Sequence, residues 1–457
     1  MLSFVHVLFV AYQFPPVGGA GVQRVTKLVR YLPVYGITPL VLTVSNPSVP
    51  VRDESLLRDV PPGIRVERVR TLEPAYAVKR ALGKGVDEIE PRAFTRALRL
   101  TSRVASGLLF PDPQVLWLPA AVRAIAKLSR DNPRIGAAVI TAPPFSQLLL
   151  APWIRKTLGV PVIVDYRDEW ETTLRAGHER PAGETAARLA RWLERRIVGR
   201  VDAVTTATQE FRAALLDRVP EVDSGRVHFL PNGWDAADLP RQFGQPPHDR
   251  FRIAYAGTVM RLTSLRQVVS ALRILHAERP ELAACVELVV YGRIAPSEAA
   301  VFRGAERLGV QLRGYIDHRL VLSELTRSHL NLCVLDEVEG ADRIYPGKVF
   351  ELMALKRRTL VIAPEGALTR LARDNEMGDV VSPPDPREIA RVLERHVRAW
   401  QAGEYQARVE PTYVNRYERK ALAGELAAIV RRVAAHPEST DSSARAEGAA
   451  PQPHAFA

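Results

Sequence analysis

Cysteine, lysine and long apolar runs are all scarce in this sequence. Only two of the 457 residues are cysteines, Cys285 and Cys333, and each lies inside an apolar run. They predict small core residues in a reducing cytoplasm and exclude a disulfide framework. The most apolar window is interrupted by Pro143 and Pro144, so we expect no membrane-spanning helix. The first residues lack the basic start and cleavage site of a secretory signal, and they predict a buried strand instead.

The sequence has no long run of residues with the same charge. Lysine supplies only 8 of the 63 basic residues, and 51 acidic residues are mixed among them, so the net charge of +12 is spread along the chain. No nucleic-acid-binding motif stands out, and we expect no nucleic-acid partner. A His/Cys cluster with ligand spacing is also missing, so we expect no metal. The remaining composition, 47% hydrophobic and 25% charged, is typical of a globular protein long enough for two domains.

Short apolar runs alternate with helical patterns along most of the chain, which predicts an α/β fold with doubly wound parallel sheets. The first series of runs covers residues 5–12, 39–46, 65–69, 137–142, 160–170, 201–208 and 226–234. The second covers residues 251–258, 286–293, 310–316, 329–335 and 358–364. A turn-rich stretch separates them, so we expect domains at 1–240 and 241–405, a helical segment at 406–435 and a disordered tail at 436–457.

The stretch 345–356, YPGKVFELMALK, carries the strongest chemical signal. Pro346 suits the first position of a helix, and the backbone of Gly347 with the cation of Lys348 suits a diphosphate at that helix N-terminus. Glu351 follows on the next turn among apolar residues, where it could accept both hydroxyl groups of a ribose. Together they predict a nucleoside diphosphate site, and hence use of a nucleotide sugar. The alternative is that Glu351 simply faces solvent.

Glycines recur where strands of both series end. Gly257-Thr258, Gly292-Arg293 and Gly314-Tyr315 should all face the same sheet edge as Lys348, because ligands of such sheets lie at the carboxyl ends of the strands. Near the start of the chain, Gly18 and Gly19 precede a helix expected near Val22 and could receive a phosphate or a sugar. The dinucleotide fingerprint fails there, since Arg24 occupies its last glycine position.

Two further charged segments have alternative interpretations. DYRDEW stands at a strand end and should bring Asp165, Arg167, Asp168 and Trp170 to the cleft, or else form a salt-bridged loop. Between residues 92 and 103, arginines recur three or four residues apart. That stripe could dock on anionic lipid or be the solvated side of a surface helix.

The motifs FPPVGGAGVQR, TAPPFS, VDYRDEW, FLPNGWD, YAGT and PGKVFELMALKRR occur in an order that resembles the GT-B glycosyltransferases, specifically family 4. The resemblance extends to about residue 432. It implies two Rossmann-like domains facing a cleft, with the acceptor in the N-terminal domain and the nucleotide sugar in the C-terminal domain. A final helix would cross back to the N-terminal domain. It further implies transfer with retention of configuration, no metal, and no cofactor besides the nucleotide-sugar co-substrate.

The resemblance also implies roles for individual residues. Glu351 would hold the ribose, and Lys348 and Gly347 the diphosphate. The donor site would further include Gly257, Thr258, Gly292, Tyr315 and Ile316, the last two at the base, while Gly18, Gly19 and Gln23 would close the cleft from the acceptor side. Arg343 stands where many relatives have a glutamate that contacts the donor sugar, and Arg261 would take the place of a phosphate-binding arginine. Asp168 and Arg167 would position the acceptor.

We therefore predict a glycosyltransferase that moves a sugar from a UDP-, GDP-, ADP- or dTDP-linked donor to an acceptor, with Lys348, Arg261, Asp168 and Arg167 as catalytic residues. The acceptor would be a cell-envelope or lipid-linked intermediate or a small metabolite. A non-catalytic sugar-nucleotide-binding protein and a nucleotide-sugar 2-epimerase are the alternatives, and Arg343 favours the first of these. We expect a monomer or homodimer, in the cytoplasm or in peripheral contact with the inner face of the membrane.

Overall fold

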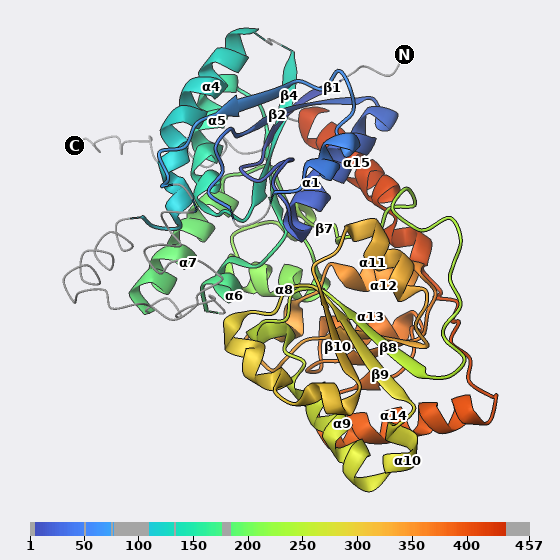
Figure 1. Cartoon of the computed structure of the whole chain (residues 1–457). Coiled ribbons are helices and arrows are strands. Elements are labelled where there is room, and N and C mark those ends of the chain that lie inside the picture. Colours follow the sequence, from blue (N-terminus) through green and yellow to red (C-terminus); the bar gives the residue numbers. More distant parts are fainter. Residues whose placement is uncertain are drawn as a thin grey trace, which may run out of the picture.

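Two domains make up the protein, one above the other in Figure 1. The computed structural model describes residues 5–49, 52–74, 76, 109–131, 134–175 and 184–435. Each domain is built on its own sheet, and every strand pair within the two sheets is parallel. The predicted α/β fold with two doubly wound sheets is confirmed. The expected tail at 436–457 and the arginine stripe at 92–103 lie outside the described residues.

The N-terminal sheet has seven strands in the order β3-β2-β1-β4-β5-β6-β7. They are β1 (Val5–Val10), β2 (Ile37–Val44), β3 (Val66–Val69), β4 (Ile135–Ala142), β5 (Val162–Tyr166), β6 (Ala203–Thr206) and β7 (Val227–Phe229). Each coincides with one of the apolar runs. The strand order reverses between β1 and β4, and such a reversal opens a crevice at the carboxyl ends of the strands.

Helices cover both faces of this sheet, as the continuous apolar runs require. Side chains alternate along β1: Leu8 and Val10 pack toward one face, and Val7 and Phe9 toward the other. The first face is covered by α4 (Leu118–Asp131), α5 (Ala151–Leu158), α7 (Glu184–Val198) and α8 (Gln209–Arg218). The second is covered by α1 (Ala20–Tyr31) and, from the far end of the chain, by α15 (Arg419–Ala435). The short α6 (Trp170–Arg175) follows β5.

The C-terminal sheet repeats this plan with six strands in the order β10-β9-β8-β11-β12-β13. They are β8 (Phe251–Ala256), β9 (Val286–Tyr291), β10 (Val310–Gly314), β11 (Leu330–Val334), β12 (Thr359–Ile362) and β13 (Val380–Val381). One face packs on α9 (Arg266–Glu278), α10 (Pro280–Ala283) and α14 (Pro386–Gln401), and the other on α11 (His318–Leu325), α12 (Lys348–Ala354) and α13 (Ala367–Asp374). Strand β13 was not predicted, because two residues show no periodicity.

The chain passes between the domains twice, and the two passages lie side by side. The backbone N–H of Trp234 donates to the carbonyl of Tyr417 at 3.0 Å, and that of Arg419 donates to the carbonyl of Trp234 at 2.8 Å. The two passages approach each other so closely that a Cβ on Gly233 would lie 2.2 Å from the Tyr417 carbonyl oxygen. Only glycine fits there. The second passage delivers α15 to the N-terminal core.

A buried lysine fastens this junction to α1. The amine of Lys27 is 1% exposed and lies 2.9 Å from a carboxylate oxygen of Asp59, 2.8 Å from one of Asp235 and 2.8 Å from one of Asp238. Asp235 and Asp238 belong to the first passage, just after Trp234. A buried ammonium requires such charge partners, since desolvation without them would be prohibitive.

Asp165 corrects one expectation, because it is 1% exposed within the N-terminal core and does not face the cleft. Its carboxylate accepts from Arg24 at 2.7 and 3.2 Å and from the hydroxyls of Thr205 and Thr141 at 2.6 and 3.1 Å. Burial acts to raise the pKa of Asp165, but Arg24 and the two hydroxyls hold it below its ordinary value. Arg24 also donates to the carbonyl of Leu230, so it ties α1 to the end of β7. The arginine that breaks the dinucleotide fingerprint is therefore a structural residue.

Replacing Asp165 by alanine should lower the free energy of unfolding by about 3–5 kcal/mol, because it leaves the buried guanidinium of Arg24 without its counter-charge. Urea denaturation followed by circular dichroism measures this loss. Glu388→Gln is a matched control, since it removes the exposed pair between Glu388 and Arg391 at 2.7 Å and should change stability by less than about 0.5 kcal/mol. Equal effects of the two variants would contradict a structural role for Asp165.

Candidate functional site

Three glycines form a bare backbone edge where strands β8, β9 and β10 end. The N–H of Gly257 donates to the carbonyl of Tyr291 at 2.8 Å, and the N–H of Gly292 donates to the carbonyl of Gly314 at 2.7 Å. Gly257 and Gly292 have φ values of +140° and +131°, which side chains rarely permit. A Cβ on Gly292 would lie 2.1 Å from the Gly257 carbonyl oxygen. The ends of β8 and β9 can therefore lie this close to each other only while Gly292 has no side chain.

Lys348 lies directly against this edge. Its ammonium donates to the carbonyl of Ala256 at 2.9 Å and lies 3.7 Å from the centre of the Tyr255 ring. A Cβ on Gly257 would be 2.8 Å from the Lys348 nitrogen. The amine has no carboxylate partner among the described residues, so two of its three N–H donors remain for a ligand. The structure thus brings together Lys348, Gly257 and Gly292, as expected.

Helix α12 begins later than the sequence predicted. Its first residue is Lys348 and its N-cap is Gly347, which no side chain caps, whereas Pro346 was expected to be the first helical residue. Pro346 instead lies in the preceding turn, where its carbonyl accepts from the N–H of Val349 at 2.9 Å. The helix also ends at Ala354, because Lys356 adopts a left-handed φ of +53°.

Glu351, on the first turn of α12, does not face open solvent. Its side chain is 15% exposed, and its Oε1 lies 3.2 Å from Nε2 of His318, the first residue of α11. Burial acts to raise the pKa of Glu351, but the charge and hydrogen bond of His318, with Arg419 and Lys27 at longer range, hold it below its ordinary value. Burial lowers the pKa of His318, and Glu351 more than offsets this and raises it. Glu351 is therefore an ionised carboxylate in a sheltered position.

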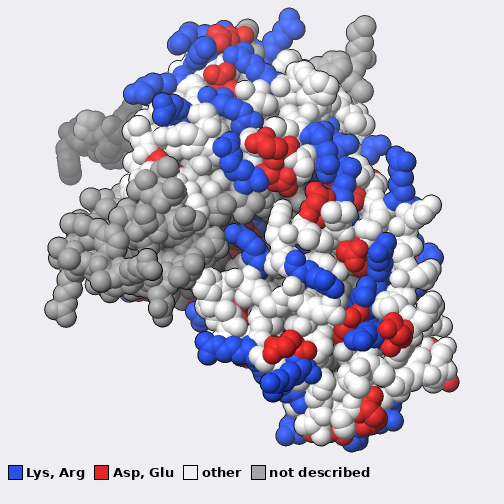
Figure 2. Space-filling model, in the orientation of Figure 1, with Lys and Arg blue, Asp and Glu red and all other residues white. Residues whose placement is uncertain are grey.

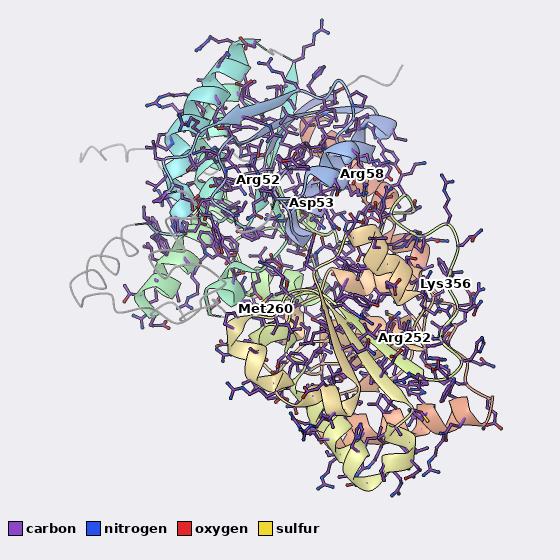
Figure 3. The ribbon with its side chains drawn as sticks, in the orientation of Figure 1. Arg52, Asp53, Arg58, Arg252, Met260 and Lys356 are labelled. Atoms are coloured by element: carbon purple, nitrogen blue, oxygen red, sulfur yellow. The ribbon has the colours of Figure 1, made fainter. Side chains whose placement is uncertain are left out.

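Tyr315 and Ile316 connect β10 to α11 beside this pair. Tyr315 is 60% exposed and Ile316 is half-buried. Burial and the charge of Asp53, from the N-terminal domain, raise the pKa of Tyr315. Figure 3 shows Asp53 on the part of the N-terminal domain nearest the C-terminal domain. An exposed ring at this level of the cleft offers a stacking surface.

Arg167, on the N-terminal side, is buried against the glycine loop. Its guanidinium donates to the carbonyls of Gly21 and Pro143, and a Cβ on Gly21 would lie 2.6 Å from Nη1 of Arg167. Gly18 is half-buried and Gly19 is exposed, with open space where a Cβ would stand. Arg167 thus braces the start of α1, and its donors go to backbone carbonyls.

Asp168, the next residue, is exposed and makes no hydrogen bond with another described residue. Desolvation by the neighbouring protein raises the pKa of its carboxyl, although Arg167 and Arg24 act in the opposite direction. A solvent-accessible carboxylate with a raised pKa at a strand end is a suitable proton acceptor or hydroxyl ligand.

Arg343 reaches across the cleft. Its Nε donates to a carboxylate oxygen of Glu169 at 2.8 Å, and its backbone carbonyl accepts from the hydroxyl of Thr208 at 2.8 Å. Glu169 also accepts from Arg218 at 2.5 Å and from the hydroxyl of Thr172 at 2.7 Å. The structure therefore places this predicted donor residue against the N-terminal domain.

The remaining predicted residues lie around the same cleft with fewer contacts. Arg261 is exposed and has no ion pair with another described residue. The carbonyl of Thr258 accepts from the hydroxyl of Thr263 at 2.7 Å. Gln23 accepts from Arg419 at 3.3 Å. Arg419 is buried, and its charge acts on Glu351, so Gln23 is linked to the donor side through it.

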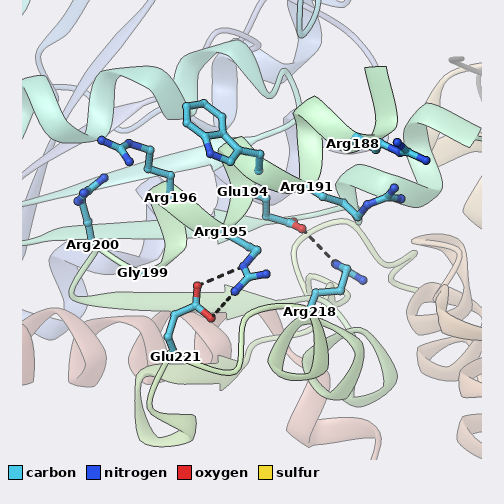
Figure 4. A pocket seen from close by; sticks show the side chains of 10 residues that line it. Arg188, Arg191, Glu194, Arg195, Arg196, Gly199, Arg200, Arg218 and Glu221 are labelled. Atoms are coloured by element: carbon cyan, nitrogen blue, oxygen red, sulfur yellow. Dashed lines mark hydrogen bonds and ion pairs between the residues drawn. The ribbon is translucent and has the colours of Figure 1, made fainter. Parts of the chain in front are cut away.

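A hollow, shown in Figure 4, lies along α7 and includes none of the predicted site residues. It is lined mainly by arginines: Arg188, Arg191, Arg195, Arg196, Arg200 and Arg218, with Trp192, Glu194, Gly199 and Glu221. Most of these are neutralised, for example Arg195 by Glu221 at 3.2 Å. Elsewhere, basic and acidic groups are interspersed over the coloured surface in Figure 2.

Comparison with known proteins identifies the N-terminal half. Residues 18–233 match the model of the glycosyl transferase 4-like domain. Across the whole chain, the similarity to solved structures confirms the predicted GT-B fold. No curated protein matches the chain significantly.

Solved structures similar to this GT-B protein are distant in sequence. Sucrose-phosphate synthase from Thermosynechococcus elongatus is 14% identical with a TM-score of 0.62, and the match covers 94% of this chain and 99% of the other. S. aureus TarM, solved with UDP, is 9% identical with a TM-score of 0.60 and coverages of 93% and 99%. Anabaena HepE, solved with UDP-glucose, is 12% identical with a TM-score of 0.54 and coverages of 94% and 98%. At such identities the likeness shows the fold.

Sequence reasoning did not find His318, Glu169 or Arg419. His318 carried a usable signal, because it follows Gly314-Tyr315 at a strand end, where ligand-facing residues of such sheets gather. Glu169 lies within DYRDEW, but only its neighbours were predicted to have a role.

Within the described ranges, no group of three or more His, Cys, Asp and Glu side chains is arranged to hold a metal. No helix in those ranges is both long and apolar enough to cross a bilayer.

The Glu169–Arg343 pair should stabilise the contact between domains. A double-mutant cycle with Glu169→Gln and Arg343→Gln should give a coupling free energy of about 2–3 kcal/mol, because both groups are sheltered and charged. Calorimetric unfolding measures it. The control cycle uses Glu210 and Arg370, another pair between the domains, 2.6 Å apart but with Arg370 53% exposed. It should give less than about 1 kcal/mol. A coupling at Glu169–Arg343 no larger than this control would contradict the expectation.

Proposed function

We propose that the protein is a retaining glycosyltransferase that takes a sugar from a nucleoside diphosphate sugar bound at the carboxyl edge of the C-terminal sheet. One observation carries this proposal: the amine of Lys348 lies against the bare edge of Gly257 and Gly292, with the sheltered carboxylate of Glu351 on the same helical turn. A cation with free N–H donors suits a diphosphate, and an ionised carboxylate suits a diol.

Lys348 would offset the charge that builds on the departing diphosphate. One such donor is worth about 3 kcal/mol, or roughly a hundredfold in rate. The uncapped N–H groups at the start of α12 add to this, since Gly347 carries no side chain. Arg261, exposed at the same edge, is proposed to reach the phosphates once a donor is bound. The proposal includes neither a metal nor a further cofactor.

The acceptor would enter from the N-terminal side, where Asp168 is accessible. We propose that its carboxylate orients the acceptor hydroxyl, while a phosphate oxygen of the donor takes the proton on the face from which the diphosphate leaves. Attack on that face retains the anomeric configuration. Arg167 precedes Asp168 in the chain, and its position is fixed because its guanidinium donates to the carbonyls of Gly21 and Pro143.

The donor base and sugar are open within this proposal. TarM and HepE were solved with UDP and UDP-glucose, which makes a uridine donor the first candidate. Tyr315 and Ile316 would contact the base. Arg343 would approach a donor sugar only if it left Glu169, so a neutral sugar suits the paired arrangement.

The test is a transfer assay with UDP-, GDP-, ADP- and dTDP-sugars and a panel of sugar, lipid-linked and small-molecule acceptors. Donors that bind should raise the melting temperature, and a chelator should leave the transfer rate unchanged. Isomerisation of the donor without transfer would instead indicate an epimerase. Binding without turnover across the panel would indicate a non-catalytic sugar-nucleotide-binding protein.

Replacing Glu351 by alanine should weaken nucleoside diphosphate binding about a hundredfold, because two hydrogen bonds to a charged acceptor are lost. Isothermal titration calorimetry gives the affinity, and circular dichroism checks the fold. Glu410→Ala is the control, since Glu410 is 59% exposed and should not alter binding. Unchanged affinity in Glu351→Ala would remove the proposed ribose site.

We also propose that the protein meets a lipid-linked acceptor at an anionic membrane surface through α7. Arg196 and Arg200 are exposed and have no carboxylate partner among the described residues, and Trp192 beside them is 53% exposed. Such a combination suits the interface of an anionic bilayer.

The double variant Arg196→Glu/Arg200→Glu should lose most of its sedimentation with phosphatidylglycerol vesicles, because two cations per molecule become anions. Arg391→Glu, which changes an exposed arginine of α14, should still sediment. Sedimentation that is the same for both variants and the unmodified protein would exclude α7 as the contact.

A further inference from the structure

The residue that holds Glu351 in place is His318. Its Nε2 lies 3.2 Å from Oε1 of Glu351, and the two side chains are 21% and 15% exposed. No other described side chain lies within ion-pair or hydrogen-bond distance of this carboxylate. An ionised carboxylate offers about four acceptor positions, so this single contact leaves most of them open, including both on Oε2.

The backbone around His318 is itself fixed. His318 is the first residue of α11, whose N-cap Asp317 accepts from the N–H groups of Arg319 at 2.8 Å and Leu320 at 3.4 Å. The imidazole has only two side-chain torsions, so a fixed backbone leaves it little freedom. A glutamate on a short helix has three, and without a partner it would sample several rotamers.

The wider surroundings keep both groups charged and turned toward each other. Asp238 acts on His318 in the same sense as Glu351, and Arg419 in the opposite sense. Arg419 and Lys27 act on Glu351 in the same sense as His318. The contact between His318 and Glu351 is the short one, at 3.2 Å, and it therefore decides the orientation of the carboxylate.

We propose that His318 is a positioning residue, whose imidazole, ion-paired with Glu351 at 3.2 Å, fixes the Glu351 carboxylate so that its free acceptor positions face the vicinal hydroxyls of the donor ribose. This inference rests on the proposed function and deepens it. His318 lies two residues after Ile316, with only Asp317 between them, so the segment proposed to contact the base would also set the ribose contact. Recognition of base and ribose would then be coupled through one short stretch of backbone.

The proposal is tested by measuring the binding of uridine diphosphate and of its 2′,3′-dideoxy analogue by calorimetry. If the donor panel selects another base, the diphosphate of that nucleoside and its dideoxy analogue are used instead. His318→Ala should weaken binding of the ribose form about tenfold, as expected for one charge-assisted hydrogen bond, and leave the dideoxy form within about twofold. A merely structural histidine would affect both forms alike, and that result would overturn the proposal.

Conservative variants keep the test decisive if the alanine variant fails to fold. His318→Gln can present an amide N–H near the position of Nε2, whereas the shorter His318→Asn cannot. Binding of the ribose form should therefore be within about threefold of the unmodified protein in the Gln variant and about tenfold weaker in the Asn variant. Equal affinities in these two variants would overturn the role of the Nε2 contact. His248→Ala, at an exposed histidine of the same domain, should bind as the unmodified protein does.

Binding by the unmodified protein distinguishes failure of the proposed function from failure of the role of His318. If it binds no nucleoside diphosphate, the proposed function fails and this inference falls with it. If it binds one more tightly than the dideoxy form, but His318→Ala preserves that preference, only the role of His318 is overturned.

Discussion

The position of α15 constrains the rest of the structure. This last helix completes the core of the first domain, so the chain must leave the N-terminal domain at Gly233 and return beside the same residue. The two passages are hydrogen-bonded to each other and leave no room for a side chain at Gly233. The two domains therefore meet at one seam, which the two passages form.

Charged contacts also lie along this seam. Lys27 gathers three carboxylates where the first passage begins, and Arg343 and Arg370 pair with glutamates of the opposite domain. Polar contacts of this kind can exchange partners more readily than a packed apolar interface.

Backbone and side chains contribute different groups to the candidate site. Gly257 and Gly292 bring the main chain to the cleft surface, and Lys348 and Glu351 add one charge of each sign one turn apart on α12. The sequence could predict these residues, because glycines at strand ends and a charged pair on an apolar helix are local signals. It could not predict that Asp165 is buried under Arg24, or that Arg167 donates to backbone carbonyls, because those partners lie more than 100 residues away or in another loop.

The sequence alone determined the two parallel sheets, since runs such as Val5–Val10 and Val286–Tyr291 are apolar on both faces and can exist only between helices. It also determined the α12 motif, whose chemistry lies within four consecutive residues. Only the tertiary structure decided that His318 lies against Glu351 and that Glu169 pairs with Arg343. Each of these is a contact between segments far apart in the chain, and its partner is chosen by how the domains pack, which no local pattern records.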